Sequence, residues 1–359
     1  MILATSAVLL AACNSSPGGN TPSPSLPDTA TGPTSPTARA GAIAFRRWSR
    51  DGSYPHVFTI EPDGTGETQL IARPAESPIL SPDGSRLAFE CLDGELVRVC
   101  MANADGSDPT MLTPDVRDTD LPIDNYAPRA WSPDGEQLVL IGFGGAPSGI
   151  FMMPATDRGK LVRVTTSPMG HSDDTLAVSP DGSRIVFVRV PNSDDHDGDV
   201  YVVAADGTGL LRLSSPGMAV ECCAHPGWSP DGSRIVFAAE SGQDAWAIYS
   251  IGVDGSDPRR ISPMDGWAFA PSWSPDGRTI SFTQSIADGA QIFVVHADGT
   301  GLVQLTHRWD GFGSWNSVWS PDGSQLVFQH GDGGRVSDLW IVGADGEGLR
   351  QLTDTPEPE

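Results

Sequence analysis

The sequence predicts an all-β protein, a β-propeller of four-stranded antiparallel blades. The first observation is the tetrapeptide Ser-Pro-Asp-Gly, which occurs six times, beginning at Ser81, Ser132, Ser179, Ser229, Ser274 and Ser320. The second is its spacing, because successive aspartates (83, 134, 181, 231, 276 and 322) are 51, 47, 50, 45 and 46 residues apart. The third is that each copy precedes a short apolar run, such as Ile235-Val236-Phe237. Strand-rich repeats of this length are typical of propeller blades.

The composition indicates one repeat domain. The chain has 359 residues, and the repeats run without a break through the segment that we assign to the propeller, residues 41–355. The formal net charge of −24 argues against nucleic acid as a partner, because phosphate binding needs a basic surface. Many of the acidic residues are turn aspartates, which we expect on a solvated surface.

The Ser-Pro-Asp-Gly segment has the chemistry of a tight turn. Proline presets φ at the second position, aspartate bonds to nearby backbone amides, and glycine adopts a left-handed conformation. The turn joins an inner strand to the apolar strand that follows. Four of these inner strands end in tryptophan, namely Trp131, Trp228, Trp273 and Trp319.

A second turn, Asp-Gly, recurs later in the units. Its aspartates are Asp63, Asp105, Asp206, Asp254, Asp298 and Asp345. The strands that follow it end in Leu-Thr in several units, as at residues 303–306. Strand, turn, strand, hairpin, strand, turn, strand makes one four-stranded blade. Because neighbouring blades cover both apolar faces, we expect the repeated Trp, Phe and Val positions to form the core.

The number of blades depends on a partial unit at the start. Residues 42–45, 57–60 and 68–71 match three of the four strands, with Asp63-Gly64 before the last of them. The inner strand is missing, and no extra strand follows Leu352 to replace it. We predict seven blades with an incomplete first blade, and six blades is the alternative.

The two turns and the strands between them resemble the TolB-type β-propeller repeat. The likeness covers nearly everything after Gly41, but the separate N-terminal α/β domain of TolB has no counterpart here. The same repeat also occurs in the propeller of prolyl-oligopeptidase-type peptidases. That enzyme is disfavoured, because no hydrolase domain follows Thr353 and the chain has no Gly-x-Ser-x-Gly.

The first forty residues predict export and a lipid anchor. Residues 2–12 are apolar, too few for a membrane-spanning helix but suited to a signal peptide, which we assign to residues 1–12. Leu10-Ala11-Ala12-Cys13 resembles the lipobox of bacterial lipoproteins, which implies lipidation of Cys13. Residues 13–40 are rich in Ser, Pro, Thr and Gly and are expected to be a tether. We therefore predict a location on the outer face of a bacterial membrane, in the periplasm or at the cell surface.

Four further cysteines would then lie in an oxidising compartment. Cys222 and Cys223 are adjacent, while Cys91 and Cys100 flank the Asp93-Gly94 turn. A two-residue hairpin at that turn would place Leu87 opposite Cys100, so a bridge to Cys91 needs a looser loop. The sequence leaves both disulfides open.

The variable segments before each inner strand are the candidate binding residues, because propellers usually bind ligands at the mouth of the central channel. They carry aromatic, charged and imidazole groups that turn chemistry does not require. Alternatively, the aromatic rings cap the blade packing and the polar groups only line a water-filled channel. The candidates are Tyr126, Arg129, His171, Asp173, Asp174, Glu221, His225, Trp267, Phe269, Trp315 and Asn316.

A metal site is a weaker hypothesis. His171, His225 and His307 precede inner strands of three units, but they lie 10, 6 and 15 residues before the turn aspartate, at unequal heights. Residues 194–199 are rich in aspartate, yet the EF-hand spacing fails. Calcium or another divalent cation therefore has only weak candidate ligands, namely His171, His225, Asp195, Asp197 and Asp199.

Two functions follow from these features. The first is a non-enzymatic, lipid-anchored envelope protein, expected to be monomeric, whose propeller binds an envelope protein, a peptide or a glycan. The second is a secreted propeller enzyme, a metal-dependent polysaccharide lyase or a hydrolase, that acts at the channel mouth. The sequence favours the first, because no nucleophile–base pair or metal-ligand spacing stands out.

Overall fold

The computed structural model describes most of the chain from Ala42 onward. The described residues are 42–48, 54–113, 123–145, 147–156, 160–192, 198–215, 218–220, 224–242, 245–262, 266–287, 289–307, 313–331 and 337–355. The predicted signal peptide, the tether and Cys13 lie outside them. Within these residues, no helix is long and apolar enough to cross a membrane.

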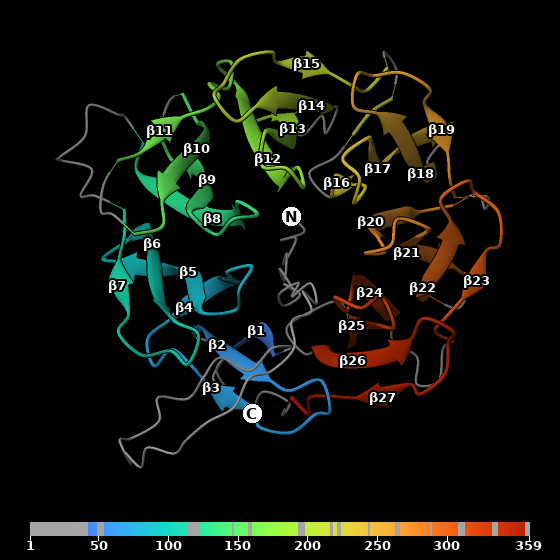
Figure 1. The fold of residues 1–359 in the computed structure, drawn as a ribbon, viewed down its shortest axis with the longest axis horizontal. Helices are drawn as coiled ribbons and strands as arrows, with labels where there is room; N and C mark the ends of the chain where they lie inside the picture. Colours follow the sequence, from blue (N-terminus) through green and yellow to red (C-terminus); the bar gives the residue numbers. More distant parts are fainter. Residues whose placement is uncertain are drawn as a thin grey trace, which may run out of the picture.

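Seven antiparallel sheets surround a central channel (Figure 1), and the prediction of seven blades with an incomplete first one is confirmed. In the described part of the chain the first blade has three strands, β1 (Ile43–Trp48), β2 (Pro55–Ile60) and β3 (Thr68–Gln69). The other six have four strands each, paired in chain order with the first strand innermost.

The bounds of these six blades follow the repeat. The second blade has β4 (Ala75–Leu80), β5 (Arg86–Asp93), β6 (Leu96–Asn103) and β7 (Thr110–Met111). The third has β8 (Asn125–Trp131), β9 (Gln137–Phe143), β10 (Gly149–Pro154) and β11 (Val162–Arg163). The fourth has β12 (His171–Val178), β13 (Arg184–Pro191), β14 (Asp199–Ala204) and β15 (Leu211–Arg212).

The last three blades repeat this order. The fifth has β16 (Gly227–Trp228), β17 (Arg234–Gly242), β18 (Ala245–Gly252) and β19 (Arg259–Arg260). The sixth has β20 (Ala268–Trp273), β21 (Thr279–Ile286), β22 (Gly289–His296) and β23 (Val303–Gln304). The seventh has β24 (Gly313–Trp319), β25 (Gln325–Gly331), β26 (Ser337–Gly343) and β27 (Arg350–Gln351).

The antiparallel order separates two faces of the ring. The face that carries the Ser-Pro-Asp-Gly and Asp-Gly turns is called the turn face. The opposite face, where the chain enters each inner strand and where hairpins join the second and third strands, is called the entry face. Both kinds of turn therefore fall on one side of the molecule, and the candidate binding segments fall on the other.

The Ser-Pro-Asp-Gly turns share one hydrogen-bond pattern. In all six, the serine hydroxyl donates to the aspartate Oδ1 at 2.5–2.6 Å. The same oxygen accepts a backbone N–H two residues later at 2.9–3.1 Å. The turn glycines have φ between 68° and 73°, a conformation that favours glycine.

The Leu-Thr ends of the units also have a structural explanation. In the six complete blades, a Thr or Ser hydroxyl after the outer strand accepts a backbone N–H from the third strand at 2.9–3.3 Å. Each outer strand is only two residues long. This bond holds the chain against the third strand beyond the end of that short outer strand. The repeated hydroxyl is therefore part of the scaffold.

The core is divided among the seven seams between blades. A separate cluster of buried apolar residues lies at each seam, with members from both blades. Three inner-strand tryptophans also bond across a seam: Nε1 of Trp131, Trp228 and Trp319 donates to the carbonyl of Ile79, Ala177 and Ser272, respectively, in the preceding blade at 3.1–3.2 Å. These bonds confirm that three of the four repeated tryptophans are core anchors, while Trp273 packs on its seam without a partner for Nε1 among the described residues.

Each inner strand is irregular at the same place. A residue six positions before the turn aspartate has a positive φ of 23–55° in five blades, at Ser77, Thr175, His225, Ala270 and Asn316. The strand register shifts there where the pairing can be followed. A bulge changes which side chains point into the seam, so simple alternation does not carry through these strands.

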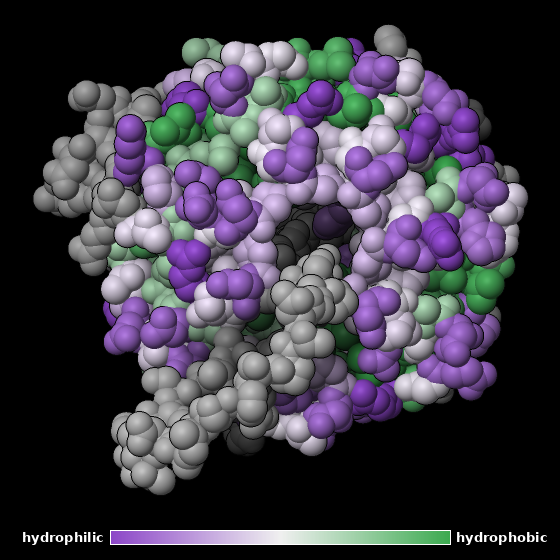
Figure 2. Space-filling view, viewed as in Figure 1, coloured by the Kyte–Doolittle hydropathy of each residue, from purple (hydrophilic) through white to green (hydrophobic). Residues whose placement is uncertain are grey.

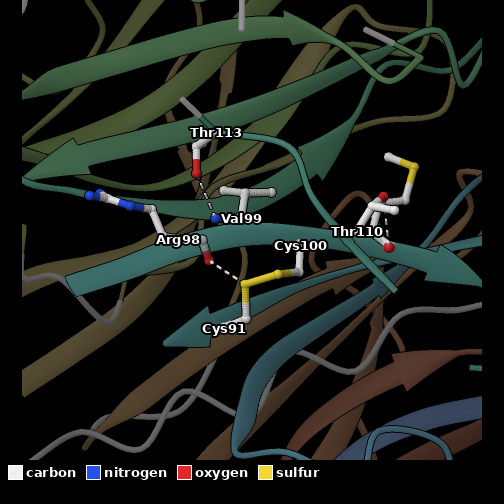
Figure 3. Close-up of a disulfide and its surroundings, with 7 residues drawn as sticks. Cys91, Arg98, Val99, Cys100, Thr110 and Thr113 are labelled. Carbon is white, nitrogen blue, oxygen red and sulfur yellow. Dashed lines mark hydrogen bonds between the residues drawn. A yellow bond between two sulfur atoms is a disulfide. The ribbon is translucent and has the colours of Figure 1, made fainter. Parts of the chain in front are cut away.

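The second blade contains a disulfide between Cys91 and Cys100, with Cα atoms 5.8 Å apart (Figure 3). The expectation that this bridge needs a looser loop is wrong. The two-residue loop is Gly94-Glu95, one residue later than assumed, so Phe89 rather than Leu87 lies opposite Cys100. Cys91 is then the diagonal neighbour of Cys100, within reach for a disulfide. Cys222 and Cys223 lie outside the described residues.

Candidate functional site

The centre of the ring is hollow, and its rim is mostly hydrophilic in the space-filling view (Figure 2). The candidate residues from the sequence approach this channel from several blades. They form two groups with different chemistry. Charged candidates lie on the third and fourth blades, and aromatic and amide candidates lie on the sixth and seventh blades.

The charged group is organised as ion pairs between blades. Arg129 of β8 bonds to Glu90 of β5 at 2.9 Å. Arg46 of β1 bonds to Glu76 of β4 at 3.2 Å. Each pair joins an inner strand to the preceding blade, and each arginine has its partner already. The predicted site residue Arg129 is therefore partly buried and neutralised by a neighbour.

Asp173 belongs to a buried ion pair and does not lie on the channel surface. Its side chain is fully buried, and Arg189 binds both carboxylate oxygens, through Nε at 2.6 Å and Nη2 at 2.9 Å. The Thr165 hydroxyl donates to the same carboxylate at 2.5 Å. Every oxygen of Asp173 is thus in use within the fourth blade and its neighbour. Its role is structural, because a buried charge needs such partners.

Tyr126 is also directed into the core. It is 1% exposed and packs edge-to-face against Phe151, with ring centroids 5.5 Å apart. Burial raises the pKa of its phenol, against a smaller lowering by Arg163 and Arg98. The hydroxyl has no hydrogen-bond partner among the described residues. Tyr126 is a seam residue and is not available to a ligand at the mouth.

The histidines and acids proposed for a metal do not converge in the described residues, where no group of three His, Cys, Asp or Glu side chains could hold a metal ion. Asp174 accepts a bond from the Thr175 N–H at 2.7 Å. Asp199 pairs with Arg212 at 2.6 Å. His171 begins β12, and His225 occupies the bulge position before β16. Asp195, Asp197 and Glu221 lie outside the described residues.

The aromatic group begins with two tryptophans on the entry face, at the seam between the fifth and sixth blades, which is called the fifth seam. The Trp246 and Trp267 rings lie 6.5 Å apart with an interplanar angle of 34°. Backbone bonds hold both segments: Trp246 N–H donates to Gly266 O at 2.9 Å, and Ser285 N–H donates to Trp267 O at 2.8 Å. Trp267 is nevertheless 50% exposed, on a backbone that cannot easily move away.

The next inner strand adds amide groups beside an indole. Gln329 Oε1 accepts hydrogen bonds from Trp315 Nε1 at 3.0 Å and from Asn316 Nδ2 at 3.2 Å. Asn316 also receives support from the sixth blade, since its N–H lies 3.3 Å from the Thr283 hydroxyl. Trp315 and Asn316 are half-buried and held by Gln329. Phe269 is partly buried and packs on the fifth seam, as the capping interpretation expects.

Two residues of this aromatic and amide group were missed in the sequence. Trp246 follows the hairpin between β17 and β18, and Gln329 lies on β25, so neither falls in the segment before a Ser-Pro-Asp-Gly turn. The signal was nevertheless available. Hairpins between second and third strands must lie on the same face as the entries to the inner strands.

Comparison with known proteins finds TolB-type propeller similarity in the C-terminal part of this chain. The model of the TolB beta propeller domain matches residues 217–359, and the resemblance seen in the sequence is confirmed. An uncharacterised protein of Agrobacterium fabrum is 27% identical over 198 residues, which cover 55% of this chain and 63% of that protein. The Tol-Pal system protein TolB of Anaeromyxobacter dehalogenans is 31% identical over 121 residues, 34% of this chain.

The chain thus spans 63% and 27% of the lengths of these two relatives. Among solved structures, an oligogalacturonate lyase in complex with manganese superposes with a TM-score of 0.61 at 14% identity, covering 84% of this chain and 85% of the lyase. At this identity the likeness shows the fold alone, because propellers with one fold serve many functions.

Proposed function

We propose that this protein is an exported, lipid-anchored envelope protein whose propeller binds a protein, peptide or glycan ligand at the entry face without catalysing a reaction. The observation that carries the proposal is the aromatic surface of the entry face, where the Trp246–Trp267 pair lies on the fifth and sixth blades and Trp315 and Asn316 lie on the next inner strand. Trp267 is half exposed on a backbone held by hydrogen bonds on both sides. Indole and amide groups together suit ligands that offer both apolar faces and hydrogen-bonding groups.

The charged half of the channel supports binding rather than catalysis. A general acid or base needs a titratable group that is free to reach a substrate. Here Arg129 and Glu90 satisfy each other, and Asp173 is fully engaged by Arg189 and Thr165. The alternative of a metal-dependent lyase or a hydrolase gains no support, because His171 and His225 stand on different blades without a third ligand among the described residues.

Export is supported from two directions. The relatives include Tol-Pal system proteins, and the second blade contains the Cys91–Cys100 disulfide. Disulfides persist in oxidising compartments such as the periplasm. The lipid anchor at Cys13 and the monomeric state remain part of the proposal. Replacing Cys13 with serine should move the protein from the membrane fraction to the soluble fraction, and unchanged membrane association would contradict the anchor.

The binding site is tested by a pull-down from envelope extract with the full chain and two matched variants. Trp267→Ala removes the exposed ring, whereas Val303→Ala removes a side chain of similar exposure, 47%, from the outer strand β23. We expect Trp267→Ala to lose the captured ligand and Val303→Ala to keep it. Equal capture by both variants would show that the aromatic surface is not the binding site.

A further inference from the structure

Among the residues that the structure describes, the first blade has no inner strand, whereas each of the other six has one. The sequence of residues 42–45 aligns with residues 86–89 at the start of β5, so β1 is the counterpart of a second strand. β1 pairs with β2 along its full length, from Ile43↔Ile60 to Trp48↔Pro55. On its other side, no strand of the described residues pairs with it. The unpaired edge faces the channel between β4 and the seventh blade (Figure 1).

This edge presents ready hydrogen-bonding groups. In an antiparallel ladder, alternate residues of β1 direct their N–H and C=O groups away from β2. For residues 43–47, no backbone hydrogen bond outside the β1–β2 ladder occurs in the part of the chain that the structure describes. Such an edge pairs readily with another extended segment. In the other six blades the same edge is covered by an inner strand.

We propose that the inner edge of β1 binds an extended segment of another protein, which completes the first blade as its fourth strand. This mode of recognition uses main-chain bonds for affinity and side-chain pockets for specificity. The space beside the inner edge of β1 is called the slot. It lies between two existing seams, because apolar clusters already join the first blade to the second and to the seventh. The proposal does not depend on the aromatic surface of the fifth to seventh blades.

The six complete blades define what the segment should look like. Eight positions before the turn aspartate, the inner strands place a buried side chain in the seam, such as Ala75, Ala268 or Ser314. At their last position, three of them place a tryptophan whose indole bonds to the preceding blade. In the slot, the preceding blade is the seventh, and the matching carbonyl belongs to Val318. The partner segment should therefore end in tryptophan.

The chain's own upstream residues match this pattern poorly. Counting back from Phe45 by the spacing of the other blades, the equivalent residues are 31–36, which read Thr-Gly-Pro-Thr-Ser-Pro. Proline stands where the inner strands have Trp, Leu or Val, so neither an indole nor an N–H is available at that position. A segment with a terminal tryptophan makes bonds that these residues cannot make.

The test uses the full-length protein and a labelled peptide with the sequence of β24, Gly-Ser-Trp-Asn-Ser-Val-Trp. Fluorescence anisotropy measures affinity, and hydrogen exchange reports which amides become protected. We expect saturable binding and slower exchange at alternate amides of residues 43–47. The amides of Arg86 and Ala88, which are directed at the inner strand β4 that already lies beside them, should not change. Replacing the last tryptophan of the peptide with alanine should weaken binding by about tenfold or more.

Three results would overturn the proposal. The first is no saturable binding, or binding that leaves the β1 amides unprotected. The second is protection of the β1 amides in the protein alone at low concentration, which would show that the chain's own segment occupies the slot. The third is protection that appears only as the protein dimerises, which would make a second copy the occupant. Equal binding of a scrambled peptide would also contradict the predicted sequence of the partner segment.

Discussion

On the turn face, six aspartates accept the same pair of hydrogen bonds at distances that agree within 0.2 Å from blade to blade. On the entry face, neighbouring blades offer an ion pair, a buried carboxylate, a pair of indoles and an amide cluster in turn. The two faces belong to the same strands. The ring therefore fixes its geometry on one side and varies its chemistry on the other.

The difference predicts different responses to substitution. Changes on the turn side should reduce stability by similar amounts in every blade, because the same contacts recur there. Changes on the entry side should depend on the individual residue. Four predictions follow from this contrast, ordered from the largest expected effect.

Replacing a tryptophan at the end of an inner strand should destabilise the protein far more than replacing one before its start. Trp228→Ala should lower the free energy of unfolding by about 3–5 kcal/mol, because it opens a cavity at a seam and removes the bond to Ala177 O at 3.1 Å. Trp267→Ala should change it by about 0.5 kcal/mol or less, because the ring is half exposed. Urea unfolding measures both. Comparable losses of unfolding free energy in the two variants would mean that Trp267 stabilises the fold as Trp228 does.

Two aspartates of the fourth blade test whether a residue on its entry side contributes to stability as the turn residues do. Asp173→Asn should cost about 3–5 kcal/mol, since it leaves Arg189 charged and buried without its partner. Asp199→Asn is the control, because its pair with Arg212 is partly exposed and should contribute about 0–1 kcal/mol. Thermal and urea unfolding report both changes. A mild effect of Asp173→Asn would instead leave this carboxylate as a candidate for ligand binding.

The turn glycines should resist replacement. Gly232→Ala should cost about 1–2 kcal/mol, because φ is 69° and alanine disfavours the left-handed region. Space is not the reason, since the nearest atom to the added Cβ would be Pro180 Cδ at 3.8 Å. Gly227→Ala is the matched control in the same blade, with an ordinary φ and its nearest neighbour at 3.6 Å. We expect no loss of stability there, and a loss equal to that of Gly232→Ala would refute the conformational explanation.

The turn aspartates should make the fold sensitive to acid. Hydrogen bonds from the turn serines lower the pKa of Asp83, Asp181 and Asp322 to about 2. In the unfolded chain the pKa is about 3.9. Because the folded pKa is the lower one, the stabilisation is present above pH 4 and is lost as pH falls from about 4 to 2.

Each turn is largely exposed, so solvent screening limits its contribution to about 0.5–1 kcal/mol. Urea midpoints measured between pH 6 and pH 2 should fall steadily below pH 4. Asp181→Asn should reduce the dependence of the urea midpoint on pH by the contribution of one turn. A slope unchanged in this variant would assign the acid sensitivity to other carboxylates.

The turn face could be predicted from the sequence because its chemistry is local. A Ser-Pro-Asp-Gly segment contains its own donors, its own acceptor and its own left-handed residue, so six copies predict six identical turns. The blade order and the incomplete first blade follow from the spacing of these turns. The seam tryptophans were predictable for the same reason, since their distance from the turn is fixed.

The entry face could not be predicted in the same way. The bulge at Ser77, Thr175, Ala270 and Asn316 has no glycine to reveal it, yet it changes the alternation of the inner strand. Asp173 and Tyr126 were therefore expected at the channel, although they point into seams. The disulfide was misjudged because a shift of one residue in a hairpin loop changes every cross-strand neighbour.

The seam bonds have a direction, which matters for how the ring is made. Trp131, Trp228 and Trp319 each donate to a blade that precedes them in the chain. A chain synthesised from its N-terminus therefore completes every acceptor before the matching indole emerges, so each new blade can dock on a finished one. At the seam between the seventh and first blades the donor again comes later in the chain, because Arg350 donates to Pro62 O, but here the two blades stand at opposite ends of the propeller sequence. Closing the ring therefore requires the last blade to have been made.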